Sequence, residues 1–250
     1  MKTSKKIFIA GIVFLVLCIG GYDLLLKKEF LTGRYKNIYS HYTTLQYKNF
    51  DALEINASQK ASICVVQGPF SIKIDPNTAE YIHFTQNGRN LQMDVQYTAE
   101  RFYNGDGYRV IISCPYLSSV KTNAFVTLNK QKLIDTVAND NWNYGKLLID
   151  GFKQDSLIIN QDYGSEVVLA NNTIGLLNAT IGISPFSGAR ITILKNNHFN
   201  VAKLQVLNKS ILTLNEAQIK HLDYRPGDST RLIINGAAKN SLIPYIHLKQ

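Results

Sequence analysis

The stretch DSLIINQDYGSEVVLANNTIGLLNATI, residues 155–181, decides the fold of this chain. Apolar side chains alternate with polar ones around Leu157 and Val167, and this period of two predicts short β-strands that each bury one face. Asp162–Ser165 and Asn171–Asn172 lie between these strands and are typical of tight turns. The pattern continues towards the C-terminus, with alternating apolar positions at Leu157/Ile159, Val167/Leu169, Leu177/Ala179/Ile181, Ile191/Ile193, Leu204/Val206, Leu212/Leu214, Leu222/Tyr224 and Leu232/Ile234.

These apolar groups form two interleaved series. One series starts at Leu157 and advances by 20, 27 and 18 residues, and the other starts at Val167 and advances by 24, 21 and 20. A repeat near 20 residues with two strands and polar turns predicts one coil of a β-solenoid, which buries its inward residues by stacking on its neighbours. The predicted fold class is therefore all-β, a parallel β-helix. An antiparallel β-sandwich with a hairpin every ten residues is the alternative.

The preceding part of the chain also has strand-like segments, separated by turns such as Asp75-Pro76-Asn77 and Asn87-Gly88. These segments are Ala52–Ala57, Ser62–Val66, Phe70–Ile74, Tyr81–Thr85, Leu91–Val95 and Tyr108–Ser113. We predict one β-solenoid domain over residues 48–237, a stalk or lead-in over 27–47 and a C-terminal tail over 238–250.

An apolar run lies close to the N-terminus. Residues 1–6 are basic, and residues 7–26 are long enough to cross a membrane as a signal-anchor helix. Cleavage after Gly20 and lipoprotein processing at Cys18 are the alternatives; Leu17 disfavours the latter, because a small residue is expected there. With the N-terminus inside, the bulk of the chain lies outside the cytoplasm, anchored to the membrane; the cleaved chain is exported.

The net charge of +9 does not indicate a nucleic-acid partner. Seven residues around the apolar run contribute +3 of it: Lys2, Lys5, Lys6, Asp23, Lys27, Lys28 and Glu29. The remaining charge forms no Lys/Arg block of the kind that follows phosphates.

Cys64 and Cys114 lie in apolar, strand-like segments, and the chain has no CxxC motif. Two interpretations stay open for them. They are either buried free thiols, which behave as small apolar groups, or the two halves of one disulfide in an oxidising compartment.

Four segments follow one another in a characteristic order: Phe50–Ile55, Val65–Ile74, Leu91–Met93 and Ser113–Val120. In this order the chain resembles the auto-transporter adhesin "head GIN" domain family, found in bacterial envelopes and notably in Bacteroidetes. The resemblance covers about residues 48–237. It implies a right-handed parallel β-helix, export and no established activity. The turns of the second half depart from the small Ser-Gly turns of that family.

The sequence predicts no catalytic residue, metal or cofactor. Its histidines lie far apart and form no HExxH or HxH pair, and GxSxG and P-loop motifs are absent. Five aspartates fall within 28 residues, at Asp135, Asp140, Asp150, Asp155 and Asp162. Such acids bind calcium in β-helical carbohydrate enzymes, but turn positions explain them more simply.

Two further groups of residues are candidate sites. Phe102, Tyr103, Trp142 and Tyr144 surround the junction of the two halves and either stack on sugar rings or cap the β-stack. Thr136 and Ser156 lie in Asp-Thr/Ser-apolar triplets that resemble bacterial O-glycosylation sites. We therefore expect a non-catalytic, envelope-anchored module that binds a glycan or another envelope protein. The alternatives are a carbohydrate-active β-helix enzyme and a structural spacer.

Overall fold

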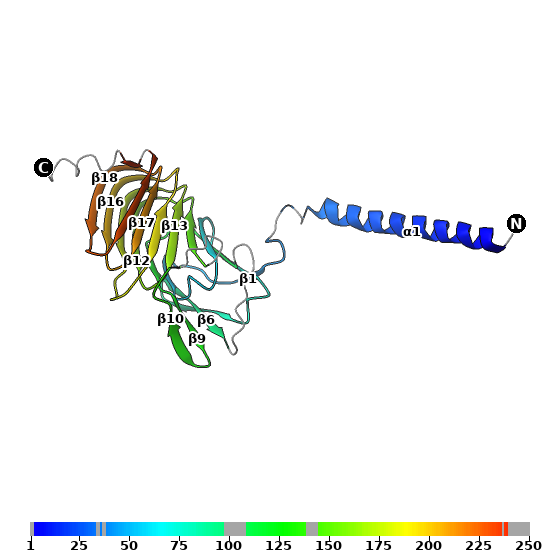
Figure 1. Cartoon of the computed structure of the whole chain (residues 1–250), viewed down its shortest axis with the longest axis horizontal. Helices are drawn as coiled ribbons and strands as arrows, with labels where there is room; N and C mark the ends of the chain where they lie inside the picture. The colour runs from blue at the N-terminus through cyan, green and yellow to red at the C-terminus, as the bar shows by residue number, and fades with distance from the viewer. Residues whose placement is uncertain are drawn as a thin grey trace. The chain divides into compact units, whose positions relative to one another are not determined.

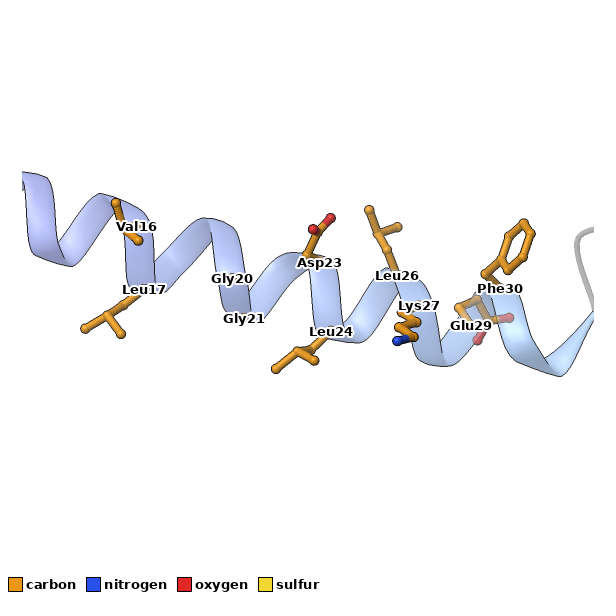
Figure 2. Close-up of a pocket in the computed structure, with 10 residues that line it drawn as sticks. All are labelled: Val16, Leu17, Gly20, Gly21, Asp23, Leu24, Leu26, Lys27, Glu29 and Phe30. Atoms are coloured by element: carbon orange, nitrogen blue, oxygen red, sulfur yellow. The ribbon is translucent and has the colours of Figure 1, made fainter.

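The computed structural model describes residues 3–33, 36, 39–97, 109–138, 145–236 and 238–239. Its internal contacts divide the chain into two units, Met1–Tyr42 and Thr43–Gln250. The first unit holds helix α1 (Thr3–Thr32), which has no buried residue and extends beyond the predicted span 7–26 at both ends. With a mean hydropathy of 2.3 in its most apolar window, α1 is long and apolar enough to cross a membrane. Figure 2 shows its C-terminal part, where Asp23 and Lys27 lie one turn apart.

The second unit consists mainly of β-strands in two mixed sheets, as the sequence predicts in outline (Figure 1). Sheet A contains, in spatial order, β1 (Thr43–Leu45), β4 (Ser71–Ile74), β7 (Val110–Cys114), β3 (Ile63–Gln67), β11 (Leu147–Asp150), β13 (Glu166–Ala170), β15 (Arg190–Ile193), β17 (Ile211–Asn215) and β19 (Arg231–Asn235). Sheet B contains β10 (Gln131–Ile134), β9 (Phe125–Leu128), β6 (Asn90–Tyr97), β2 (Ala52–Ile55), β8 (Ser119–Thr122), β12 (Lys153–Gln161), β14 (Thr173–Ile181), β16 (His198–Val206) and β18 (Gln218–Pro226), while β5 (Ile82–Asn87) pairs with β6.

From β11 to β19 the chain alternates between the two sheets, and each strand pairs in parallel with the strand two places later. The register places the inward side chains of successive strands beside one another, so that Val167 pairs with Ile191 and Ile191 with Leu212. Two expected matches in sheet B differ by a single inward position. Leu177 pairs with Ala202, and Leu204 pairs with Tyr224. The intervals are therefore 25 and 20 residues, instead of 27 and 18.

The turns that lead from sheet A to sheet B share a backbone conformation. A residue with positive φ follows each sheet-A strand from β11 to β19: Gly151, Asn171, Asn196, Glu216 and Gly236. Glycine and asparagine adopt this left-handed conformation most readily. Two residues separate the strands at the turns after β11, β13 and β17, and four separate them at the turn after β15. The turn is therefore similar, though not identical, at each crossing between the sheets.

The N-terminal strands are less regular, because antiparallel pairs are mixed with parallel ones. The sequence did not predict β1, the hairpin β9–β10 or β11, since strands of three or four residues give little periodic signal. The two sheets enclose one continuous apolar core, which extends from Phe50 to Ala238.

Candidate functional site

A groove crosses sheet B where four long strands bend. The hydrogen-bonded register omits one position in each strand, at Asp155, Gly175, Asn200 and Lys220. Buried side chains are therefore three residues apart at this point, as in Ile174 and Leu177, instead of two. An irregularity of this kind bends a strand and redirects its side chains. Because all four strands share it, the bend becomes a continuous groove.

The groove has a volume of about 910 Å³. Its floor is apolar and is formed by the buried side chains of Ile174, Phe199 and Ile219. Its exposed lining is polar and comes from two rows, one of Lys153, Thr173, His198 and Gln218 and the other of Asp155, Asn200 and Lys220. Neighbouring strands lie about 4.8 Å apart, so the groove offers a hydrogen-bonding side chain at regular steps over roughly 14 Å.

The charge of the groove is weakly positive. Lys153 and Lys220 contribute two ammonium groups, and Asp155 is the one carboxylate among the described residues that line it. His198 adds imidazole nitrogens between them. This set suits a ligand with many hydroxyl groups and some negative charge.

Gly175 lies at the bend of the second strand, β14, where the backbone of β12 approaches closely. A Cβ atom at this position would lie 2.6 Å from the backbone oxygen of Asp155, which is closer than side chains tolerate. A glycine within a strand marks such a close approach of another backbone. This signal is present in the sequence, but the bend becomes visible only when the four strands are aligned.

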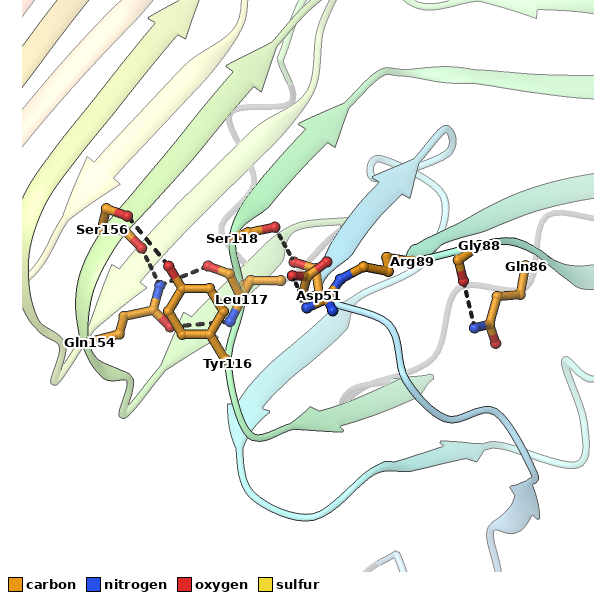
Figure 3. Close-up of polar contacts among 9 residues, drawn as sticks. All are labelled: Asp51, Gln86, Gly88, Arg89, Tyr116, Leu117, Ser118, Gln154 and Ser156. Carbon is orange, nitrogen blue, oxygen red and sulfur yellow. Dashed lines mark hydrogen bonds and ion pairs between the residues drawn. The ribbon is translucent and has the colours of Figure 1, made fainter.

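One end of the groove is joined to the N-terminal strands by polar contacts (Figure 3). The side-chain amide of Gln154 donates to the carbonyl of Leu117 at 2.7 Å, and its oxygen accepts from the Leu117 amide at 3.1 Å. The hydroxyl groups of Tyr116 and Ser156 lie 3.4 Å apart. These contacts fix the first strand of the groove, β12, to the segment before β8.

The predicted aromatic site lies outside the part of the chain that the structure describes. Phe102, Tyr103, Trp142 and Tyr144 all lie outside the described residues. Of the two expected glycosylation positions, Thr136 is exposed, whereas Ser156 is half-buried beside Tyr116. Modification of either residue remains a prediction.

The cysteines are free in the structure, without the disulfide that the sequence left open. Cys64 and Cys114 lie on the adjacent strands β3 and β7, but Cys64 pairs with Ile111 and Cys114 with Gln67. A shift of three residues separates their Cα atoms by more than a disulfide can span. Cys114 is also buried while Cys64 is half-buried, and burial raises the pKa of each thiol to about 12.

The aspartates that could indicate an enzyme lie in different places. Asp155 lines the groove, Asp150 accepts from Asn171 at 2.8 Å, and Asp162 accepts from the amide and hydroxyl of Ser184. Asp135 accepts from the Val137 amide at 3.3 Å, and Asp140 lies outside the described residues. Within the described part of the chain, no three His, Cys, Asp or Glu side chains come together as a metal site would require.

Comparisons with known proteins give only distant likenesses. No protein-family model matches the chain, and no curated protein matches it. A solved structure described as a "putative adhesin", from Parabacteroides distasonis, is 12% identical with a TM-score of 0.48, over 77% of this chain and 74% of that one. Another "putative adhesin", from Bacteroides fragilis, is 13% identical with a TM-score of 0.40, over 78% and 96%. A "putative lipid binding protein" from Parabacteroides distasonis is 11% identical with a TM-score of 0.27, over 78% and 95%. At these scores the likenesses assign neither a family nor a ligand.

Proposed function

We propose that this protein is a non-catalytic binding module of the bacterial envelope that holds an acidic glycan in the groove of sheet B. In this proposal α1 is an uncleaved anchor in the inner membrane, and the β-domain lies in the periplasm as a right-handed parallel β-helix. The parallel register from β11 to β19 and the apolar length of α1 support these assignments. The groove supports the function.

The lining of the groove favours a glycan over another protein. Rows of amide, hydroxyl and ammonium groups above an apolar floor can bind the hydroxyl groups and the apolar faces of sugar rings at once. The strand spacing presents these groups at steps comparable to the length of one sugar unit. Lys153 and Lys220 would pair with carboxylates of the glycan.

Binding of polygalacturonate to the full chain in nanodiscs tests this function. We expect saturable binding that is weaker by about tenfold in the variant Lys153→Ala/Lys220→Ala, because each ammonium group supplies a charge-assisted contact. Lys203→Ala is the matched control, because Lys203 is exposed on the neighbouring strand β16 but does not line the groove. Neutral dextran should bind more weakly than polygalacturonate.

Two results would contradict the proposal. One is an equal loss of binding in the Lys203→Ala control, and the other is no binding of either polysaccharide. Release of new reducing ends or of unsaturated sugars during the incubation would favour the alternative, a carbohydrate-active enzyme.

A further inference from the structure

An exposed apolar patch lies at the opposite end of the sheet-B strands from the groove. It consists of four side chains whose exposed fractions range from 45% to 75%: Ile134, Val137, Ile183 and Phe186. Eight residues separate Ile183 from Gly175 in the groove, a distance of about 25 Å along an extended strand. The patch is therefore a separate surface from the proposed glycan site.

Phe186 is the most exposed member of the patch, at 75%, and its backbone has a φ of +65°. A bulky residue is rare in this left-handed region, and such strain persists only where surrounding contacts impose it. Here the Ser184 hydroxyl donates to Asp162 at 2.5 Å, and the Asn208 amide donates to the Gly182 and Ser184 carbonyls at 2.6 and 2.9 Å. The turn thus holds an apolar ring in solvent.

A second segment extends the apolar surface beside this turn. The Gly188 amide donates to the Thr136 carbonyl at 2.7 Å, and the Ala138 amide donates to the Gly188 carbonyl at 2.9 Å. These bonds fix Val137 next to the turn, with an exposed fraction of 63%. Ile134 precedes it at the end of the hairpin strand β10.

Two lysines flank the patch. Lys209 is exposed, and its backbone amide donates to the Ser187 carbonyl within the turn at 3.0 Å. Lys132 lies on β10 two residues before Ile134 and on the same face, with its Nζ 3.5 Å from the centre of the Phe125 ring. The nearby acidic groups are already engaged, because Asp162 accepts from Ser184 and Asp135 accepts from the Val137 amide.

We infer that this patch docks on a lipid surface with anionic headgroups. Aliphatic and aromatic side chains with flanking lysines are the chemistry of interfacial membrane contact. Lysine is depleted from protein–protein interfaces, which makes a protein partner the weaker candidate. The inference rests in part on the proposed anchor. Ten residues lie between Thr32 and Thr43, and a linker of this length extends no further than about 35 Å. An anchored helix would therefore hold the β-domain near a lipid surface.

Quenching by brominated lipid tests the docking. The full chain is reconstituted in vesicles of phosphatidylethanolamine and phosphatidylglycerol, with Trp142→Phe removing the one native tryptophan. Phe186→Trp or, if that variant does not fold, Val137→Trp then reports on the patch. Ile158→Trp is the control, since Ile158 is 45% exposed on β12 outside the patch. In the fraction that floats with the vesicles, we expect at least a twofold loss of emission at the patch and little loss at position 158.

Equal quenching at both positions, or none at the patch, overturns the docking while leaving the anchor intact. Blue-shifted emission without quenching means that protein covers the patch, and this also overturns it. Protein that does not float with the vesicles refutes the anchor itself, and the docking with it.

Discussion

Asp75 and Arg109 form the most buried ion pair among the described residues. Their side chains are 2% and 12% exposed, with 2.5 Å between Asp75 Oδ2 and Arg109 Nη1. Burial raises the pKa of the Asp75 carboxyl, but bonds from Asn77 and Arg109 outweigh this and hold the pKa below its ordinary value of 3.8. The pair joins the end of β4 to the start of β7, so it fixes an antiparallel strand to the sheet.

Removing one partner of this pair should be costly. We expect Arg109→Ala to lower the free energy of unfolding by about 3–5 kcal/mol, because it leaves a buried carboxylate without its counter-ion. Urea unfolding followed by circular dichroism measures the effect. Arg89→Ala is the control, because Arg89 pairs with Asp51 while its own side chain is 75% exposed. A comparable loss in the control would contradict the role that we assign to burial.

The same pair gives a pH dependence with a definite sign. A carboxyl whose pKa is lowered by folding contributes stability above its ordinary pKa and loses that contribution as the pH falls through the folded value. The stabilisation from Asp75 should therefore be complete above about pH 5. In the wild type it should be lost as the pH falls below 3.8, whereas Asp75→Asn should show no such loss from this position, because asparagine does not titrate.

At the scale of elements, buried asparagines connect successive turns. Asn172 donates to the Ile149 carbonyl at 3.0 Å and accepts from the Phe152 amide at 2.9 Å. Its own amide groups donate to Asn197 in the next turn at 3.0 and 3.1 Å. Both asparagines are fully buried, so their hydrogen bonds take the place of water for backbone groups that no strand pairs.

Asn172→Leu removes the three hydrogen bonds of this side chain and leaves the bond from the Asn172 backbone amide to Asn197 in place. We expect it to lower the free energy of unfolding by about 2–4 kcal/mol, because the buried Ile149 carbonyl and Phe152 amide lose their partners. Asn178→Ala, at an exposed position of β14, should change it by less than about 0.5 kcal/mol. Chemical denaturation of both variants checks the difference. An unchanged free energy of unfolding in Asn172→Leu would show that the turns do not depend on these bonds.

The sequence predicted the strands β12 to β19 because their inward residues alternate over several positions. It did not reveal the groove, because a bend shared by Asp155, Gly175, Asn200 and Lys220 depends on which residues become neighbours. That register depends on turn lengths: the turn Gly182–Gly188 adds four residues to the interval between Glu166 and Arg190, and the turn after β15 adds a fifth to the interval between Thr173 and His198. The left-handed backbone conformation of Phe186 could likewise not be predicted from the sequence, since the surrounding contacts impose it on a residue that rarely adopts it.

For the whole molecule, the proposed anchor predicts behaviour in cells. The full chain should stay with membranes through carbonate extraction, because α1 carries an apolar span of sufficient length. External protease added to spheroplasts should digest the β-domain, and a cytoplasmic marker protein should remain intact. A soluble product whose N-terminus follows Gly20 would instead show that the segment is a cleaved signal peptide.

The repeated parallel pairing from β12 to β19 makes the length of this protein adjustable. Each strand pairs in parallel with the next one in its sheet. Excision of residues 198–217 would join Asn197 to Gln218, and β14 would then pair with β18 as it now pairs with β16. Duplication or loss of about sixty nucleotides could thus add or remove one strand of each sheet, a step of about 4.8 Å, without substitutions in the adjacent strands. Under the proposed function, each such step would lengthen or shorten the groove by one strand and thereby the stretch of glycan that it holds.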